Sequence, residues 1–589
     1  MLCGIASNNN KLLYNLFYIR IMSKEMYREL IEIIKKEKPT KRKLARIKIN
    51  LCKKYNVKEI PTDIKILLHA TPQDIDKLSL VTKPTRTISG VAVVAIMSYP
   101  FSCPHGKCIV CPGGPASPFG DIPQSYTGKE PATMRALRNN FDSYLQVMNR
   151  LEQYIVTGHA PDKVELIIMG GTFPSFRKSY QEKFISYAFK AMNDFSSMFY
   201  RKNKFDYKKF KQFFELPGDV GDPIRTKNIH EKLKKLRGKS ILEKEQKKNE
   251  KSNIRCVGLT LETRPDYAKL KQGKEMLKLG CTRVEIGVQS VYEKALKNIK
   301  RGHSVKDTIE SFKILKDLGF KINAHYMLGL PGISKEKDLE GLQELFLNPD
   351  FKPDMLKIYP CMVVEGTELY KLWKKKKYKP LTTKQAGEII AEAKRFIPTY
   401  CRITRIMRDI PTNMTKAGVD RTNLRQYIEQ LTKKKKIKCK CIRCRESGHV
   451  LRKNKNIKVG KIKIKVLYYN ASDGNEFFIS CEDPKNDILF GYCRLRFPNK
   501  LLRKEITEDS ALIRELHIYS PLISIGKKSK HSYQHRGLGK KLLEKAEEIA
   551  KTYYKKKIVI ISGIGARRYF SKMNYRKQGP YMVKLLKNP

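Results

Sequence analysis

The sequence has no long hydrophobic run. The best candidate near its start, residues 12–22, is short and is broken by Asn15 and Arg20, whereas a membrane-spanning helix needs about 18–20 apolar residues. There is also no secretory signal. Residues 1–21 have no helical or strand period, so we expect translation to start at Met22, with a targeting peptide as the alternative. These absences predict a cytoplasmic protein with no membrane partner.

Acidic residues are scarce. The 589 residues include 58 Asp and Glu against 120 Lys and Arg, a formal net charge of +62. A solvated basic face explains a few such charges but not an excess of this size, although the lysine bias of an AT-rich genome accounts for part of it. Because basic proteins gain salt-sensitive affinity by releasing counterions, we expect a polyanionic partner, with nucleic acid and acidic lipid as the candidates.

A chain of this length is expected to form two to four domains. Residues 1–80 are predicted to form an extension and a basic helical segment, because Ile31, Ile33 and Ile34 stand between basic clusters. Helices this basic suit a solvated surface as well as a grip on phosphates. The patterns described below predict three further parts, residues 81–395, 396–455 and 456–589.

Three cysteines stand close together without a fourth. Cys103, Cys108 and Cys111 have the spacing C-x4-C-x2-C. Thiolates are the preferred ligands of iron–sulfur clusters. Three of them leave one iron of a [4Fe–4S] cluster open, as in radical S-adenosylmethionine (SAM) enzymes, whose usual spacing is C-x3-C-x2-C. A zinc site that adds His105 is an alternative, and a disulfide is disfavoured because many of the 14 cysteines are isolated.

Apolar strand-like runs alternate with helical stretches across the first half of the chain. The runs are Val91 to Met97, Val164 to Met169, Cys256 to Leu261, Arg283 to Val288, Lys321 to Met327 and Met355 to Tyr359. Continuous apolar runs are typical of buried parallel strands. Repeated β/α units favour an α/β fold, a full or partial (β/α) barrel with its chemistry at the C-terminal strand ends.

Glycine and polar residues end these runs. Gly170, Gly171 and Thr172 follow the second run, where glycines let SAM approach the backbone closely, although tight turns also use them. Glu262 and Arg264 follow the third run and are either SAM ligands or a rim ion pair. Lys357, near the end of the last run, is either a snorkelling rim lysine or a ligand for an acidic group.

Residues 200–253 interrupt the barrel pattern. The segment is rich in Lys, Glu and Asn and carries PGDVGDP from Pro217 to Pro223. It offers little apolar surface to bury, so we expect a disordered or mobile charged insertion, with RNA contact as a lesser alternative.

A second cysteine group lies in the predicted linker, residues 396–455. Cys439, Cys441 and Cys444, with His449 five residues on, have a spacing that suits a small structural zinc site. Zinc prefers four ligands, and His449 is the nearest fourth, with Cys401 a distant one. Reduced thiols without a metal are the alternative.

Residues 456–589 change character again. Strand-like runs are followed by Gln534, Gly537 and Gly539 in the pattern Q-x-x-G-x-G, which opens a helix. Backbone N–H groups of such a loop, at a helix N-terminus, suit a pyrophosphate. GNAT acetyltransferases hold acetyl-CoA at a loop in this order of elements, and a tight turn is the alternative. Tyr569 and Tyr575 either donate a proton or pack in the core.

Together these motifs resemble the radical-SAM tRNA uridine carboxymethyltransferase family, which includes the catalytic subunit of Elongator. The resemblance covers nearly all of residues 75–589 and includes the blocks SYPFSCPHGKCIVCPGGP, QSYTGKEPATMRALR, DKVELIIMGGTF, RCVGLTLETRPD, TRVEIGVQSVY, IRELHIYS and QHRGLGKKLLEKAEEIA. The cysteine spacing and the trio at 439–444 resemble the archaeal or bacterial branch. The resemblance implies a radical-SAM partial barrel, a C-terminal GNAT acetyltransferase fold and a basic helical N-terminal segment.

The resemblance also implies a reaction. Cys103, Cys108 and Cys111 would bind the cluster, and SAM on its open iron would give a 5′-deoxyadenosyl radical. This radical would take hydrogen from the methyl group of acetyl-CoA. The carbon radical would add to carbon 5 of the wobble uridine of tRNA, and oxidation and thioester hydrolysis would leave 5-carboxymethyluridine.

Site residues follow from the strand ends and the family motifs. The predicted SAM ligands are Gly170, Gly171, Thr172, Glu262 and Arg264. The acetyl-CoA site is predicted to comprise Lys163, Glu515, Leu516, His517, Ile518, Gln534, Gly537, Leu538, Gly539, Lys540, Tyr569 and Phe570, with Lys163 and Tyr569 catalytic. Phe570 stands where the family commonly has a second tyrosine and lacks its hydroxyl, so only a contact is expected of it.

The implied partners are the anticodon stem-loop of tRNA, an electron donor, and either a second copy or accessory subunits. An unpaired wobble base can be splayed into a pocket, and Arg135, Arg138, Arg405 and Arg408 are candidate phosphate contacts unless they form ion pairs. One alternative function is a histone-like protein lysine acetyltransferase that uses the GNAT domain alone. Another is a nucleic-acid-binding subunit with a decayed site.

Overall fold

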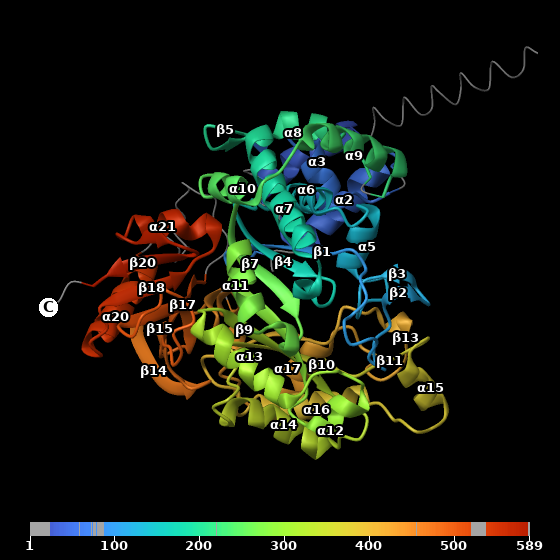
Figure 1. Ribbon diagram of the computed structural model, residues 1–589. Helices are drawn as coiled ribbons and strands as arrows, with labels where there is room; N and C mark the ends of the chain where they lie inside the picture. The colour runs from blue at the N-terminus through green and yellow to red at the C-terminus, as the bar shows by residue number, and fades with distance from the viewer. Residues whose placement is uncertain are drawn as a thin grey trace, which may run out of the picture. The chain divides into compact units, whose positions relative to one another are not determined.

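The computed structural model of the chain describes residues 24–57, 59–71, 73–74, 78, 80, 87–219, 221–454, 456–519 and 537–586 (Figure 1). The chain divides into two compact units. The first unit comprises the described residues before 87, together with residues 148–161 and 195–238. The second comprises residues 87–147 and 162–194 and the chain from residue 239 onward.

The start of the first unit is helical, as the basic amphipathic pattern predicts. A helix over residues 24–37 is followed by α2 (Lys41–Lys54) and α3 (Asp63–His69). The Thr40 side chain caps α2 by accepting a hydrogen bond from the Lys43 backbone amide. Apolar side chains from all three helices form one core, which includes Leu30, Ile34, Leu44, Leu51 and Ile66.

The segment 200–253 is folded. It forms β5 (Tyr200–Arg201), β6 (Lys204–Phe205), α8 (Tyr207–Phe213), α9 (Pro223–Arg237) and α10 (Leu242–Asn249). Phe210 and Phe214 are buried against Phe195 and Phe199 at the end of α7 (Lys178–Phe199). The expectation that this segment buries little apolar surface is therefore wrong. The abundant lysines obscure phenylalanines whose i, i+4 spacing places them on one helix face.

Seven parallel strands form the sheet of the second unit's first half. Its order is β1 (Ala92–Met97), β4 (Lys163–Met169), β7 (Arg255–Thr263), β8 (Arg283–Gln289), β9 (Lys321–Leu328), β10 (Met355–Pro360) and β12 (Arg402–Ile406). The sheet has two edges, β1 and β12, so the predicted (β/α) barrel is partial. Strand β12 lies in the stretch predicted to be a linker, so the parallel sheet continues beyond residue 395.

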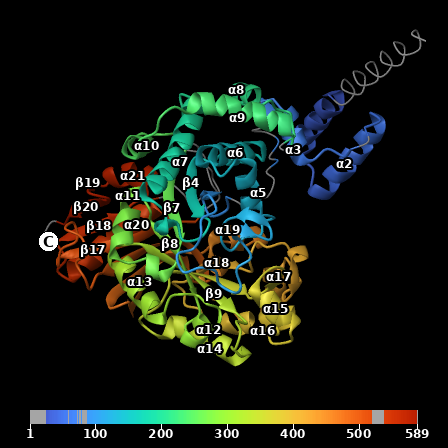
Figure 2. The same cartoon turned by 45° about the vertical axis from the view of Figure 1, so that its right-hand side comes forward.

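Helices lie between these strands along the chain, and Figures 1 and 2 label them. They are α5 (Pro131–Arg138), α6 (Ser143–Val156), α7, α11 (Leu270–Leu279), α12 (Glu293–Asn298), α13 (Val305–Asp317), α14 (Lys335–Leu347), α15 (Glu368–Lys374) and α16 (Thr383–Ala393). Shorter elements are β2 (Gly114–Ser117), β3 (Gly120–Ile122), β11 (Val363–Val364), β13 (Thr415–Ala417), α17 (Leu424–Lys434), α18 (Ile442–Arg445) and α19 (Ser447–Lys453).

A mixed sheet forms the second half of the same unit. Its order is β14 (Lys463–Ala471), β15 (Gly474–Asp483), β16 (Ile488–Phe497), β17 (Ser510–Ile518), β18 (Lys557–Ile561), β20 (Tyr581–Leu585) and β19 (Arg576–Gln578). Helix α20 (Leu538–Thr552) packs on this sheet through Leu542, Leu543 and Ala546, and α21 (Arg567–Ser571) follows β18.

Strands β17 and β18 separate part-way along their length. They pair in parallel from Ser510 to Ile513, whereas β17 stays paired with β16 as far as Ile518. A bulge at Arg494/Leu495 marks the same level of the sheet. The result is an opening beside the last residues of β17, to which α20 presents its first turn.

Buried arginines join the two halves of the second unit. Arg514 on β17 forms two hydrogen bonds to Asp354, of 2.6 and 2.8 Å, and Asp354 directly precedes β10. Arg496 on β16 lies 2.8 Å from Asp317 at the end of α13. Arg496 is 0% exposed and Arg514 is 1% exposed. Buried charges that are paired in this way fix the geometry of the elements that carry them.

Candidate functional site

One cavity lies at the C-terminal ends of the parallel strands, and we name it the cysteine cavity. It is lined by Cys103, Cys108 and Cys111 from the loop after β1, and by groups from the ends of β4, β7, β8, β9 and β10. These include Gly171, Thr172, Glu262, Arg264, Glu285, Gln289, His325, Lys357 and Tyr359. Chemistry in this type of sheet is generally placed at these strand ends.

The three thiols are free and surrounded by hydrogen-bond donors. The Ser125 amide donates to Cys111 Sγ at 3.2 Å, and the Nε2 atom of His105 lies 3.1 Å from Cys108 Sγ. Burial raises the pKa of Cys103 to about 11 and also raises that of Cys111. Their thiolate forms therefore need a cationic centre beside them, which a bound metal cluster provides.

The spread of these thiols suits a cluster better than a single ion. A tetrahedral zinc ion with bonds of about 2.3 Å keeps its sulfur ligands within about 4 Å of one another. Among the described residues, Cys439, Cys441 and Cys444 form a group whose ligand atoms all lie within 4.8 Å, whereas the loop trio does not. The alternative of a zinc ion held with His105 is thus the less suitable one.

The loop after β4 needs its glycines. Gly170 and Gly171 have φ angles of 120° and 110°, which disfavour any other residue. A Cβ atom on Gly170 would lie 2.4 Å from Ser98 Oγ. The Gly170 amide donates to the Glu262 carboxylate, while Gly171 and Thr172 line the cavity. The backbone is therefore open to a ligand at this point, as the sequence predicts.

Glu262 and Arg264 have different surroundings. Burial, with a smaller contribution from Glu285, raises the pKa of Glu262 to about 7, although Lys357 opposes this. Arg264 pairs instead with Asp266, at 2.9 and 2.7 Å, and donates to the Gly302 carbonyl. The two residues do not pair with each other, so a rim ion pair between them is not what the structure shows.

A buried ionic group that the sequence does not reveal lies deeper in the half-barrel. Glu285 on β8 pairs with Lys357 on β10 and lies 3.0 Å from the Nε2 atom of His325 on β9. Burial alone would raise the pKa of Glu285, but Lys357 and His325 hold it well below its ordinary value. Alternate residues of a strand share a face, and the alternation of Arg283 and Glu285 was the signal available in the sequence.

The candidate phosphate contacts differ in availability. Arg135 is buried and donates to the Ala95 carbonyl at 2.6 Å, so it serves the fold. Arg405 pairs with Asp409, and Arg408 donates to the Ser125 carbonyl, yet both line the cysteine cavity. Both guanidinium groups are thus at the cavity, each with a partner within the protein.

A second cavity of about 810 Å³ lies beside the first turn of α20, and we name it the α20 cavity. The predicted acetyl-CoA residues that line it are Lys163, Glu515, Leu516, His517, Ile518, Gly537, Leu538, Gly539, Lys540, Tyr569 and Phe570. Gln534 lies outside the described residues. The volume of the α20 cavity is typical of small-molecule sites, which range over roughly 300–1,000 Å³. The structure therefore brings the described members of this set together.

Close packing surrounds the start of α20. A Cβ atom on Gly539 would lie 2.6 Å from the Tyr569 hydroxyl oxygen, so glycine is needed there. Phe570 is buried in the core of the mixed sheet, and Tyr575 is buried with its hydroxyl on Glu547. Of the two candidate tyrosines, Tyr569 is the one with access to the cavity.

The charges of the α20 cavity come from several strands. Burial alone would raise the pKa of Glu515, but Lys321 and Arg494 hold it at about 2, so it stays ionised at neutral pH. Burial lowers the pKa values of His517 and Lys163. The His517 Nε2 atom lies 3.0 Å from the Ser89 carbonyl and must donate to it, because a carbonyl only accepts.

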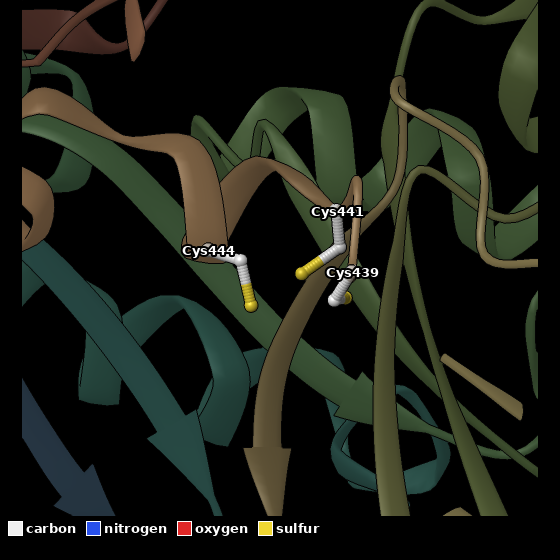
Figure 3. Close-up of side chains that lie close together, drawn as sticks. All are labelled: Cys439, Cys441 and Cys444. Atoms are coloured by element: carbon white, nitrogen blue, oxygen red, sulfur yellow. The ribbon is translucent and has the colours of Figure 1, made fainter. Parts of the chain in front are cut away.

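The cysteine trio near α18 forms a compact group. Cys439, Cys441 and Cys444 turn their sulfur atoms toward a common space (Figure 3). His449 lies outside this group, with its Nε2 atom 3.5 Å from Glu446 on the same helix turn, so the structure does not place it as a fourth ligand. Cys401 interacts with Cys441 electrostatically but is also outside the group.

No helix within the described ranges is both long and apolar enough to cross a membrane.

The chain matches known families along most of its length. Residues 98–345 match the Radical SAM superfamily, residues 353–434 the Radical_SAM C-terminal domain, and residues 22–88 the ELP3 N-terminal domain. It is 47% identical to the tRNA uridine(34) acetyltransferase of Methanocaldococcus jannaschii, over 89% of this chain and 90% of that protein. It is 38% identical to Elongator complex protein 3 of Homo sapiens, over 92% and 93% of the two chains.

A solved structure agrees with these matches. The archaeal Methanocaldococcus infernus Elp3 with an N-terminal deletion (1–46) is 41% identical to this chain. It superimposes with a TM-score of 0.69, and the match covers 85% of this chain and all of that one.

Proposed function

Because the chain belongs to the family of tRNA uridine(34) acetyltransferases and Elongator complex protein 3, we propose that it carboxymethylates carbon 5 of the wobble uridine of tRNA, with acetyl-CoA as the acyl donor. The observation that carries the proposal is the presence of two cavities in one compact unit. One has the three thiols of a cluster site, and the other has a helix N-terminus with glycine at Gly537 and Gly539.

In the cysteine cavity, Cys103, Cys108 and Cys111 would hold a [4Fe–4S] cluster. Bound together, the cluster and SAM supply one-electron cleavage of SAM and thus a hydrogen-abstracting radical. The glycine loop at Gly170 and Gly171 and the Glu262 carboxylate would bind the methionine part of SAM, because open backbone and an anion suit its amino group. Arg264, tied to Asp266, would position the backbone at Gly302, whose carbonyl accepts from it.

The mixed sheet and α20 would form a GNAT acetyltransferase fold, and the α20 cavity would be its acetyl-CoA site. The first amides of α20, from Leu538 onward, would bind the pyrophosphate of acetyl-CoA. Tyr569, above Gly539, and Lys163, whose pKa is lowered by burial, would contact the thioester end. Glu515 stays ionised and His517 is fixed by the Ser89 carbonyl, so both would orient rather than exchange protons.

Further ligands and partners belong to this proposal. Cys439, Cys441 and Cys444 would bind a structural zinc ion, with the fourth ligand different from His449. The basic helices of the first unit would contact tRNA, and Arg405 and Arg408, which line the cysteine cavity, would contact the anticodon stem-loop. An external electron donor would reduce the cluster. Accessory subunits or a second copy of this chain would be further partners.

The test is anaerobic reconstitution with iron and sulfide, followed by reductant, SAM, acetyl-CoA and bulk tRNA. Nucleoside mass spectrometry should show 5-carboxymethyluridine that is absent without SAM. If no such peak forms while tRNA binds and the cluster is present, the proposed reaction is contradicted, and peptide acetylation should be assayed to test the lysine acetyltransferase alternative.

Cys108→Ser should abolish the product and the cluster absorbance while tRNA binding is unchanged, because the thiol binds the cluster and not RNA. Cys481→Ser is a matched control, since Cys481 is also buried, at 1% exposed against 8% for Cys108, but lies in the core of the mixed sheet. Product that survives Cys108→Ser would exclude the radical mechanism.

A further inference from the structure

The two cavities lie at opposite ends of the same strands. On β7, Val257 lines the α20 cavity and Glu262 the cysteine cavity. At β8, the corresponding residues are Thr282, directly before the strand, and Glu285 within it. At about 3.3 Å per residue, the cavities are about 10 Å apart along β8 and about 17 Å apart along β7. A hydrogen atom cannot be transferred across such a gap, because reacting atoms must come within roughly 3–3.5 Å.

The inside of the half-barrel lies between the cavities and is polar. Arg283 pairs with Glu165 on β4 and lies 3.5 Å from Glu285, which belongs to the cysteine cavity. Arg283 also interacts with Glu515, which belongs to the α20 cavity. Charged groups therefore lie between the two cavities, where most barrel interiors are filled by branched apolar side chains.

Two residues of β7 bear on this interior. Gly258 has no side chain, and a Cβ atom there would meet Thr282 Oγ1 at 3.6 Å and Glu165 Cγ at 3.7 Å, which are ordinary contact distances, so alanine fits at this position. Thr260, two residues on and so on the same face, is 1% exposed, and its hydroxyl has no hydrogen-bond partner. The Arg283 Nε atom is also buried without a partner. Buried polar atoms of this kind indicate a water molecule or a ligand.

We propose that the inside of the half-barrel, along Gly258, Thr260 and Arg283, is the passage by which the acyl end of acetyl-CoA reaches the cysteine cavity from the α20 cavity. The inference rests on the proposed function. The thioester carbonyl accepts from Arg283 Nε and the Thr260 hydroxyl, which are the two unpartnered donors. The nucleotide end remains at α20, and the flexible arm of the coenzyme spans the gap.

Photo-crosslinking tests the passage without turnover. The reconstituted protein is incubated with a CoA thioester whose acyl group carries a diazirine, without reductant, and adducts are mapped by mass spectrometry. Adducts on the peptides of β7 and β8 that contain Thr260 or Arg283 are expected. Adducts confined to residues 515–518, 537–540 and 569 would overturn the proposal.

Substitutions at Gly258 test it in the reaction. Gly258→Leu fills the passage, and Gly258→Ala is the matched control because its Cβ fits. With trideuterated acetyl-CoA, Gly258→Leu should lower deuterium transfer into 5′-deoxyadenosine by about 10²-fold. Its affinity for acetyl-CoA and its cleavage of SAM without acyl donor should match those of Gly258→Ala. Transfer at the control level would overturn the passage.

A second variant tests the passage if Gly258→Leu does not fold. Thr260→Val keeps the side-chain shape and removes the unpartnered hydroxyl, so deuterium transfer should fall several-fold with cluster content unchanged. Unaltered transfer would contradict the proposal. The experiments distinguish failure of the passage from failure of the proposed function. A wild-type protein that gives adducts on β7 but no 5-carboxymethyluridine would contradict the proposed function and leave the passage supported.

Discussion

Glu262 shows how one carboxyl group of the cysteine cavity is set by its neighbours. Burial moves its pKa from the ordinary 4.5 to about 7, while Glu285 nearby is held ionised by Lys357 and His325. Two carboxylates of the same cavity thus differ in protonation near neutral pH. The one at the strand end can change its charge as a ligand binds, whereas the deeper one stays fixed.

Glu262→Gln should remove a pH dependence of stability. The carboxyl group has the higher pKa in the folded protein, so folding is favoured most below about pH 4.5 and this contribution is lost as the pH rises through about 7. At pH 8 the variant should therefore be more stable than the wild type by about 1–3 kcal/mol, and at pH 4 the two should be equal. Denaturant unfolding at both pH values checks this, and a constant difference would contradict the pKa shift.

At the scale of single residues, the sequence predicts the functional groups that stand at the ends of helices and strands. Cys103, Gly170 and Tyr569 are recognisable because each occurs in a motif whose spacing carries chemical meaning. Glu285 and Thr260 are not, because they stand inside strands and belong to no such motif. Which face of a strand they occupy depends on register, and register is set by pairing with distant segments.

Among the elements, β16 and β17 depend on buried arginines for their place in the second unit. Arg514→Met should cost about 3–5 kcal/mol, because it leaves the Asp354 carboxylate buried without its two-hydrogen-bond partner. Arg503→Met is the control. Its partner Glu505 belongs to a more exposed pair, and its loss should cost less than about 1 kcal/mol. Equal midpoints of chemical unfolding for the two variants would refute this role.

Helix α8 should behave as a folded element. Phe210 is 1% exposed among the phenylalanines of the first unit, so Phe210→Ala should destabilise that unit by about 3–5 kcal/mol. Hydrogen exchange of residues 200–238 should then accelerate while cluster content in the second unit stays constant. Ile224→Ala, at a position 73% exposed, should change neither. Fast hydrogen exchange of this segment in the wild type would instead support its interpretation as a disordered, charged insertion.

The elements were predictable where hydrophobic pattern decides them. The six apolar runs between Val91 and Tyr359 are strands of the half-barrel, since a buried parallel strand reads as continuous apolar sequence. Strand β12, RITRI, has three polar residues among five and therefore reads as a polar linker. Its membership of the sheet is decided by pairing with β10, a tertiary interaction that local pattern does not encode.

For the molecule as a whole, the net charge of +62 dominates the expected interaction with tRNA. Counterion release should make the association constant for tRNA fall on the order of 10²–10³-fold between 50 and 200 mM salt. Fluorescence anisotropy with a labelled anticodon stem-loop across that range measures the slope. A flat dependence would show that the basic excess is compositional and does not contact phosphates.

Beyond Ile513, the structure pairs no described strand with the edge of β17 that faced β18. The groups available there are the amide and carbonyl groups of the main chain, which are the same whatever the side chains. A coenzyme arm that contains amides can add to such an edge as a peptide does in β-augmentation. Recognition of this kind tolerates replacement of Leu516 or Ile518 by other strand-forming residues. Relatives can therefore keep the binding mode while their sequences at these positions diverge.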